Sequence, residues 1–417
     1  MDVEVAIISM GVLYFLGHFL THFFNRSNIP DVLILIAFGI VVGPVLKVVT
    51  PEMLGGAGRI FTSIALIIIL FDGGLDLEFK TIMRSMALSL RVTVLCFLTT
   101  ALVTCLLMHY MFGYSVLVGL ITGFICGGTS SAVVIPMVNV LKVGSESRTT
   151  LVLESALTDV LCIVFTLGVL QSMESGTLLI GHMIGKLISS LVLAMLTGAL
   201  SGFVWLRLLN KIRTYPNTQF ATFAIVFIVY GIAESLGFSG AIAALAFGIV
   251  LGNHSIISYR LRQFVGTRQP MGVLTDAEKI LYKEIVFLLK IFFFVYLGIS
   301  IPLGHVSFVV MAMCMVLAVY LLRPFIIKAV VRKADVSTRD MSILGVMAPK
   351  GLAAAVLAGL PMQYGVFEGS DIQSITYNVV LISIVATSIL VPLLQRTFVG
   401  RISARFYGRS KTDNPTK

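Results

Sequence analysis

Long apolar runs recur along the whole of this chain, and they limit the folds open to it. The chain has 417 residues, of which 58% are hydrophobic and 12% charged, whereas soluble domains are roughly 45–50% apolar and 25% charged. A helix needs about 20 apolar residues to cross a bilayer. We therefore predict an all-α polytopic membrane protein with about thirteen spans, near residues 3–24, 31–49, 58–77, 85–109, 115–137, 149–171, 178–206, 219–236, 239–253, 283–303, 305–327, 340–362 and 373–396.

Lysine and arginine are unevenly distributed among the connections between these spans. Connections after odd-numbered spans and the C-terminal tail are basic, while connections after even-numbered spans are nearly bare. Because basic loops stay in the cytoplasm, we expect a multi-pass cell (inner or plasma) membrane protein with its N-terminus outside and its C-terminus inside. Topology and lipid headgroups then explain the net charge of +10, and nucleic acid is not an expected partner. Asp2 and Glu4 replace a basic n-region, so the first span is expected to remain uncleaved.

Cysteine and histidine give little sign of a disulfide or a resident metal. All five cysteines fall inside spans without Cys-x-x-Cys spacing, which supports neither a disulfide framework nor a zinc site. His18 and His22 have the i, i+4 spacing of helical metal ligands, but no third ligand lies nearby in the sequence. Packed or interfacial histidines are the favoured interpretation, and no cofactor is expected.

Two segments of the chain resemble each other. Residues 37–44 (AFGIVVGP) recur 209 positions later as residues 246–253 (AFGIVLGN), and residues 70–75 more weakly resemble residues 293–298. The first pair lies in spans two and nine, seven crossings apart, so the two copies must run in opposite directions through the membrane. The pattern predicts an inverted-topology repeat, with spans 1–6 and 8–13 as the two copies, an architecture of many secondary transporters.

Glycine and proline interrupt two spans that correspond in these repeats. Span five contains Gly127 and Gly128 followed by Thr129, Ser130 and Ser131, and span twelve contains Pro349, Lys350 and Gly351. A broken helix in the bilayer exposes backbone groups that must line a cavity or find polar partners. We predict two discontinuous helices that cross near the midplane, where inverted-repeat transporters bind their substrates. A kink satisfied by neighbouring hydroxyls is the structural alternative for either break alone.

Two carboxylates, Glu154 and Asp159, lie inside the sixth apolar run. A charge at the bilayer centre costs about 2.5–3.5 kcal/mol on insertion scales, so such residues usually mark an ion or proton pathway. Helical geometry separates the two side chains by about 140° around the axis, and Asp159 shares its face with Ser155 and Cys162. The pair is therefore interpreted as one working carboxylate, Asp159, and one structural carboxylate, Glu154.

Glu154 requires a partner if it is charged, because an unpaired buried charge is far more costly than a paired one. Lys350 at the second helix break is the predicted partner, in a structural ion pair between the repeats. Lys290 is a second candidate, although its side chain can instead extend to the cytoplasmic surface. Asp72 lies one turn deeper than Asp76, and either lines a cytoplasmic funnel that attracts cations or caps its helix at the interface.

These motifs together resemble the monovalent cation/proton antiporter superfamily over essentially the whole chain. The NhaP-like branch carries Glu-Ser-Leu-Leu-Asn-Asp in its sixth helix, which residues 154–159 match except at Ala156 and Thr158. Its Phe-Glu-x-Gly-Leu element is similar to residues 71–75, with Asp72 in place of Glu. Its Gly-Leu-Arg-Gly-Ala element is similar to residues 348–352.

Other stretches, residues 128–132 and 293–300, look more like the KefC-type branch. The resemblance implies the NhaA/NhaP-type antiporter fold over residues 1–402, with a short cytoplasmic tail at 403–417. It further implies a homodimer in which a core (about 85–171 and 305–396) moves against a dimerisation scaffold (about 3–77 and 178–303).

Thr158 departs from the family pattern, because relatives carry Asn, Asp or Gln at this position. A hydroxyl offers one oxygen ligand but does not carry a proton as Asp does. We therefore expect electroneutral exchange of one monovalent cation (Na⁺, possibly Li⁺ or K⁺) for one H⁺ by competition at Asp159. The other expected ion and proton ligands are Thr158, Ser155, Thr129, Ser130 and Asp72.

Three other functions are alternatives to this one. A K⁺/H⁺ efflux antiporter of KefC type is the near alternative, and a sodium-coupled organic solute symporter can share the same fold. An intramembrane aspartyl protease would carry Tyr-Asp and Gly-Leu-Gly-Asp motifs, which are missing from the sequence. The expected protein is a transporter in a lipid bilayer and not an enzyme.

Overall fold

The computed structural model describes residues 11–12, 14–15, 17–19, 31–141, 143–175, 180–215, 218–254, 274–300, 306–331, 336–396, 403 and 405–408. Most of the predicted span 3–24 and His22 therefore lie outside the described residues. Within these ranges the chain forms helices, turns and loops, without a strand, so the predicted all-α fold class is confirmed.

The described helices follow one another through short connections. In chain order they are α2 (Asp31–Ile40), the π-helical turn η1 (Val41–Val45), α3 (Pro51–Leu75), α4 (Phe79–Leu106), the π-helical turn η2 (Leu107–Met111), α5 (Val116–Ile125), α6 (Ser131–Leu141), α7 (Ser145–Ser175), α8 (Ile180–Ile212), α9 (Ala221–Ser235), α10 (Gly240–Gly252), α12 (Asp276–Ile299), α13 (Val306–Val331), α14 (Thr338–Val346), α15 (Leu352–Leu357), α16 (Leu360–Gln363) and α17 (Gly369–Arg396).

Among the described residues, five helices are long and apolar enough to cross a bilayer by themselves. They are Phe79–Met111, Ser145–Leu170, Ile184–Ile212, Val306–Val331 and Gly369–Leu394. Each has at least 26 residues, which at about 1.5 Å per residue exceeds a hydrocarbon core of about 30 Å. Shorter apolar helices overlap the predicted spans 31–49, 58–77, 115–137, 219–236, 239–253 and 340–362, and the 24-residue helix α12 overlaps the predicted span 283–303.

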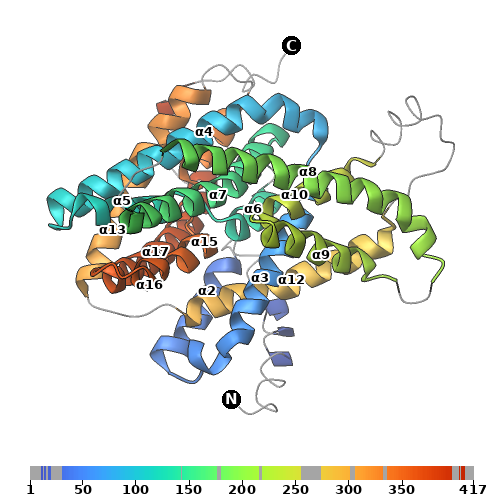
Figure 1. Ribbon diagram of the computed structural model, residues 1–417, viewed down its shortest axis with the longest axis horizontal. Helices are drawn as coiled ribbons and strands as arrows, with labels where there is room; N and C mark the ends of the chain where they lie inside the picture. The colour runs from blue at the N-terminus through green and yellow to red at the C-terminus, as the bar shows by residue number, and fades with distance from the viewer. Residues whose placement is uncertain are drawn as a thin grey trace.

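The helices form two groups that lie side by side (Figure 1). One group packs α4, α5, α7, α13, α14 and α17 together, and the other packs α2, α3, α8, α9, α10 and α12 together. Helix α6 lies between the groups, because it contacts α7 of the first and α3 of the second. The interruption between α5 and α6 is thus next to the boundary between the groups.

Close glycine contacts in the second group reproduce the internal repeat. A Cβ atom on Gly39 of α2 would lie 2.9 Å from the Cα of Gly298 in α12. A Cβ atom on Gly248 of α10 would lie 3.2 Å from the Cα of Gly74 in α3. Small residues at such positions let two helix backbones approach closely. Since Gly39 and Gly248 are equivalent in the repeat, their contact residues Gly298 and Gly74 are equivalent as well. The predicted match of residues 70–75 with residues 293–298 instead aligned Leu75 with Gly298, and is therefore out of register by one residue.

Candidate functional site

Two helices are interrupted in the interior of the molecule. Helix α5 ends at Ile125 and α6 begins at Ser131, while α14 ends at Val346 and α15 begins at Leu352. The first interruption contains Gly127 and Gly128, and the second contains Pro349 and Gly351; residues 347–351 are all buried. Backbone groups in these two segments therefore cannot rely on water and require partners within the protein.

The two interrupted segments touch each other. The backbone N–H of Ser130 donates to the carbonyl oxygen of Pro349 at 2.7 Å. A Cβ atom added to Gly351 would lie 2.0 Å from Ser130 Oγ, so the crossing leaves no room for a larger residue. On the other side, a Cβ atom on Gly128 would lie 2.8 Å from Cys162 Sγ of α7. Glycine at 128 and 351 thus allows the two segments to meet against α7.

Helix α7 supplies the hydroxyl groups that meet the first interruption. Thr158 Oγ1 accepts a hydrogen bond from the Thr129 N–H at 3.0 Å and donates one to the Ser155 carbonyl at 3.1 Å. The Thr129 and Thr158 hydroxyls are 3.5 Å apart. Ser155 Oγ donates to the Val152 carbonyl at 2.9 Å. The structure therefore gathers three of the predicted ligands, with acceptor lone pairs left on the Ser155 oxygen.

Asp159 faces the start of α6. Ser131 Oγ donates to Asp159 Oδ2 at 3.4 Å, and Ser131 is the first residue of that helix. Asp159 is partly exposed, although its neighbours Thr158 and Val160 are buried. A helix N-terminus carries partial positive charge and attracts an anion. Sequence reasoning missed Ser131 as a site residue, although its position directly after Ser130 in the interruption was visible.

Asp72 lies on α3, a helix of the second group that contacts α6. Helix α3 contacts α6 closely, since a Cβ atom on Gly73 would lie 2.8 Å from Ile135 Cδ1. Asp72 is partly exposed, and none of the described residues bonds its carboxylate. The structure thus places Asp72 near the boundary between the helix groups but does not join it to Asp159.

Glu154 is paired with Arg323 of α13, and the prediction of Lys350 as its partner is wrong. Arg323 Nη1 and Nη2 donate to the two carboxylate oxygens at 2.6 and 2.7 Å, and Nε donates to the Leu344 carbonyl at 2.8 Å. The exposed fractions are 0% for Glu154 and 3% for Arg323. A planar guanidinium matches both oxygens of a carboxylate at once, which an ammonium does not.

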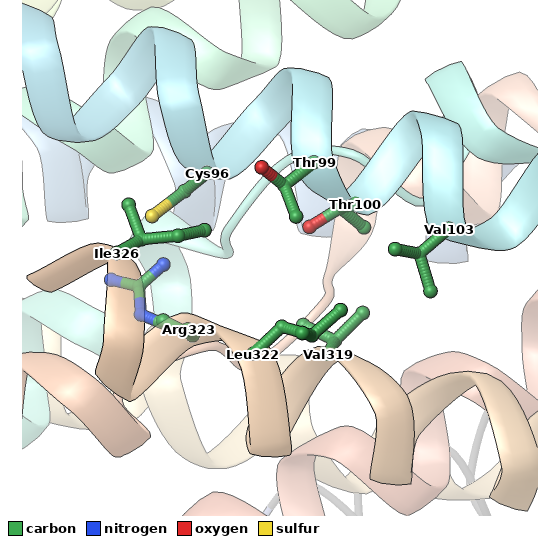
Figure 2. A pocket seen from close by; sticks show the side chains of 8 residues that line it. All are labelled: Cys96, Thr99, Thr100, Val103, Val319, Leu322, Arg323 and Ile326. Carbon is green, nitrogen blue, oxygen red and sulfur yellow. The ribbon is translucent and has the colours of Figure 1, made fainter.

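Arg323 had a detectable sequence signal, because it is a charged residue within the apolar run 306–331. In the sequence this stretch was interpreted only as the span near 305–327. The side chain lies beside a small cavity of about 10 Å³ between α4 and α13, together with Cys96, Thr99 and Thr100 (Figure 2).

Lys350 is buried, with 3% of its surface exposed. It lines a second cavity of about 10 Å³ with Thr100, Thr104, Tyr320 and Ser383, a volume that holds about one water molecule. None of the described residues forms a hydrogen bond or ion pair with its ammonium. The second candidate partner of Glu154, Lys290, has its Nζ 5.6 Å from the ring centroid of Phe287 on the same helix.

A comparison with known families now identifies the chain. Residues 11–396 match the model of the transmembrane sodium/hydrogen exchanger family. The chain belongs to this family. The exchanger is a transporter and not an enzyme, and it exchanges a monovalent cation for protons. The match selects this function over the sodium-coupled symport of an organic solute.

Curated relatives of this exchanger carry both sodium and potassium in their names. A probable Na⁺/H⁺ antiporter 2 of Methanocaldococcus jannaschii is 24% identical over 374 residues, covering 86% of this chain and 85% of that protein. The Na⁺/H⁺ antiporter 1 of the same organism is 23% identical and covers 99% of this chain and 98% of that protein. A K⁺/H⁺ antiporter NhaP of Alkalimonas amylolytica is 21% identical, over 92% of this chain and 65% of that protein.

Solved structures show the same fold. The sodium proton antiporter MjNhaP1 of Methanocaldococcus jannaschii superposes on this exchanger with a TM-score of 0.69, at 20% identity, covering 98% of this chain and all of that one. A second structure of MjNhaP1 gives a TM-score of 0.73 over all of both chains. The NhaP-type antiporter fold predicted from the sequence is confirmed.

Proposed function

We propose that a monovalent cation and a proton compete for Asp159, and that the exchange is one for one and electroneutral. The observation that carries this proposal is the pairing of Glu154 with Arg323. Of the two carboxylates within residues 150–170 of α7, Glu154 is held by a guanidinium, whereas Asp159 accepts, among the described residues, a single hydrogen bond from the Ser131 hydroxyl. One carboxylate without a permanent counter-ion binds one positive charge at a time, either a cation or a proton.

The groups around Asp159 are suited to a partly dehydrated alkali cation. Such ions are held by oxygen atoms that replace the hydration shell. Ser155 and Thr158 direct their hydroxyl hydrogens to backbone carbonyls, so they present oxygen lone pairs toward their surroundings. We propose Thr129, Ser130, Ser155 and Thr158 as oxygen ligands around Asp159, with Asp72 attracting cations toward the site from the cytoplasmic side.

Sodium is the proposed cation, with Li⁺ or K⁺ as substitutes. Two of the relatives above are named Na⁺/H⁺ antiporters and one is named a K⁺/H⁺ antiporter. Exchange driven by K⁺ alone would instead assign this chain to potassium export of KefC type. A scan of Li⁺, Na⁺, K⁺ and Rb⁺ gradients distinguishes the two by which ion drives proton movement.

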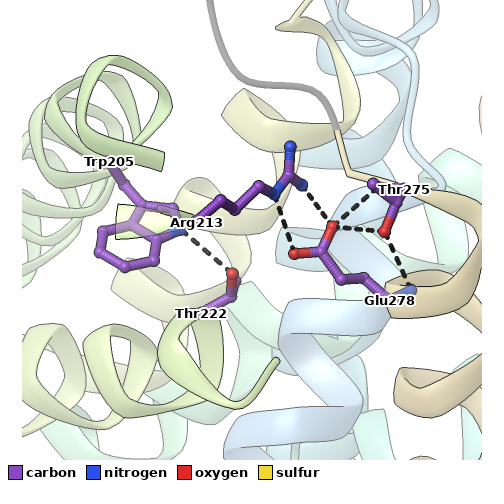
Figure 3. Close-up of polar contacts among 5 residues, drawn as sticks. All are labelled: Trp205, Arg213, Thr222, Thr275 and Glu278. Atoms are coloured by element: carbon purple, nitrogen blue, oxygen red, sulfur yellow. Dashed lines mark hydrogen bonds and ion pairs between the residues drawn. The ribbon is translucent and has the colours of Figure 1, made fainter. Parts of the chain in front are cut away.

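We further propose that the group around α7 is a core, at about residues 85–171 and 305–396, that moves against a scaffold at about 3–77 and 178–303. Arg213 beyond α8 bonds Glu278, which forms a capping box with Thr275 at the start of α12 (Figure 3). Trp205 Nε1 of α8 donates to Thr222 Oγ1 of α9 at 3.1 Å. These bonds brace three helices of the scaffold against one another.

The scaffold is also the proposed contact of a homodimer, with each N-terminus outside the cell membrane and each C-terminus in the cytoplasm. This orientation rests on the basic residues after odd-numbered spans. Protease or thiol-reactive probes applied to intact cells test it, since only the outer loops react.

Voltage dependence tests the electroneutral exchange. Purified protein in liposomes is given a Na⁺ gradient, and the internal pH is followed with the membrane potential clamped at zero and at about 100 mV. One net charge per cycle is worth about 2.3 kcal/mol at 100 mV. We expect equal proton flux at both potentials, and a flux that follows the potential would contradict one-for-one exchange.

A further inference from the structure

The second helix interruption is capped by a hydroxyl from the long helix α17. The backbone N–H of Lys350 donates to Ser383 Oγ at 2.9 Å. Ser383 Oγ in turn donates to the carbonyl of Val380, three residues earlier on its own helix, at 2.9 Å. Ser383 is fully buried. The Ser383 hydroxyl therefore accepts a hydrogen bond from the interrupted segment and donates one within its own helix.

The first interruption has the same arrangement on the other half of the chain. Thr129 lies two residues before α6 and donates its N–H to Thr158 of α7, while Lys350 lies two residues before α15. Thr158 also donates to a carbonyl three residues earlier, as Ser383 does. The two hydroxyls thus hold equivalent positions in the two repeats. Ser383 is the counterpart of Thr158.

We propose that Ser383 is a positioning residue for cation exchange, acting on the Asp159 site from the opposite half of the chain. This inference rests on the function proposed above for that site. An interrupted segment has no helical acceptor for the Lys350 N–H, and a buried N–H without a partner is costly. The Ser383 hydroxyl supplies the acceptor and thereby fixes the peptide that joins Lys350 to Pro349.

That peptide carries the contact between the two interruptions. Its Pro349 carbonyl accepts the Ser130 N–H at 2.7 Å. Ser130 is flanked by Thr129, which bonds Thr158, and by Ser131, which bonds Asp159. A rotation of the Pro349 peptide would therefore displace the segment that surrounds the proposed cation site, although Ser383 itself touches none of the proposed ligands.

Removal of the hydroxyl alone is possible at this position. The Ser383 carbonyl accepts hydrogen bonds from Tyr320 and Thr387, and a side-chain substitution leaves these backbone bonds in place. Ser383→Ala thus deletes the cap for Lys350, Ser383→Thr retains a hydroxyl, and Ser383→Cys keeps a side chain of similar size with a weakly bonding thiol. Ser388→Ala is the matched control, because Ser388 lies on the same helix and its buried hydroxyl has no partner among the described residues.

The measurement is Na⁺-driven proton flux in liposomes for equal amounts of folded protein, with the half-maximal Na⁺ concentration and the maximal rate determined separately. Loss of one hydrogen bond to a buried group predicts a roughly tenfold higher half-maximal concentration for Ser383→Ala. Ser383→Cys should show a smaller increase, and Ser383→Thr and Ser388→Ala should match the unmodified protein. A purely structural role would reduce the yield of folded protein without this selective rise.

An unchanged half-maximal concentration in Ser383→Ala, or an equal change in Ser388→Ala, overturns the positioning role. If Ser383→Ala does not fold, Ser383→Cys decides the question, and normal cation affinity in that variant overturns the role. Failure of the proposed function is recognised separately with Asp159→Asn. If Asp159→Asn retains exchange, the site itself is misassigned; if it is inactive while Ser383→Ala binds Na⁺ normally, only the positioning role fails.

Discussion

Arg323 of α13 donates to both carboxylate oxygens of Glu154 of α7, at 2.6 and 2.7 Å. The guanidinium also bonds the Leu344 carbonyl at the end of α14. This buried pair joins residues from the two halves of the chain and neutralises one of the two carboxylates within residues 150–170 of α7. Asp159 is the other carboxylate of that stretch, and it is the one that we propose binds the transported ion.

Removing one member of this pair should destabilise the protein strongly. Glu154→Gln leaves the Arg323 guanidinium buried without a counter-ion, and breaking a buried pair from one side costs about 3–5 kcal/mol. We expect a markedly lower melting temperature of the detergent-solubilised protein. The double variant Glu154→Leu with Arg323→Met removes both charges and should recover much of the loss. A double variant less stable than either single one would contradict this account of the pair.

The contact between the two interruptions should not tolerate a side chain at 351. Gly351→Ala places a methyl group 2.0 Å from Ser130 Oγ, and overpacking of this kind typically costs about 1–3 kcal/mol. We expect the maximal rate of exchange to fall at least about tenfold, which corresponds to about 1.4 kcal/mol. Gly359→Ala serves as the control, since the nearest atom there is 3.7 Å away. Equal activity of the two variants would argue against a tight crossing.

An ion pair bridges the two helix groups. Arg148 of α7 bonds Asp76 at the end of α3 at 2.5 Å, and Asn139 of α6 at 2.6 Å. If the core moves against the scaffold, this bond must open in each cycle. Because both charged side chains are partly exposed, the pair adds at most about 1 kcal/mol to stability. We expect Asp76→Arg to change the maximal rate at least about twofold with little effect on the melting temperature.

The exchanged pair Asp76→Arg with Arg148→Asp should restore the original rate, because the attraction returns with its signs reversed. Glu146→Gln is the control: it breaks a pair with Arg84 at 2.6 Å between α7 and α4, which lie in the same group, and should leave the rate unchanged. Loss of activity in the exchanged pair equal to that in the single variant would show that the bond does not open and close during transport.

Competition at one carboxylate fixes how cation affinity depends on pH. If a proton on Asp159 excludes the cation, as proposed, the half-maximal Na⁺ concentration should rise about tenfold for each unit of falling pH in the acid range, as linkage requires for one proton per cation. Sodium titrations of the initial flux at several pH values measure this slope. A slope near two would indicate that a second group, with Asp72 the first candidate, also exchanges a proton.

Local chemistry made much of this fold predictable from the sequence. Glycine and proline within apolar runs indicated where α5 and α14 end, because such residues weaken or break helices wherever they lie. The repeat was visible because close backbone contacts demand small residues, as at Gly39 and Gly248. The weaker match, between residues 70–75 and 293–298, was out of register by one residue. Either Gly74 or Leu75 can be aligned with Gly298 in the sequence, and only the helix contacts of Gly74 and Gly298 decide between them.

The partner of Glu154 was beyond local reasoning. Arg323 and Lys350 both carry positive charge within apolar runs, and the choice between them depends on how α13 and α14 are oriented around α7. The sequence does not specify that orientation. The hydrogen bonds of Ser131 and Ser383 were missed for the same reason, because each joins elements that are brought together only when both repeats have packed.

Substitution of the proposed exchanging carboxylate tests the central claim most directly. Asp159→Asn keeps the shape of the side chain and removes both its charge and its capacity to carry a proton. Purified Asp159→Asn protein is placed in liposomes, and proton flux is recorded when a Na⁺ gradient is applied. We predict no Na⁺-driven proton flux above that of empty liposomes; flux at the rate of the unmodified protein would contradict the assignment of Asp159.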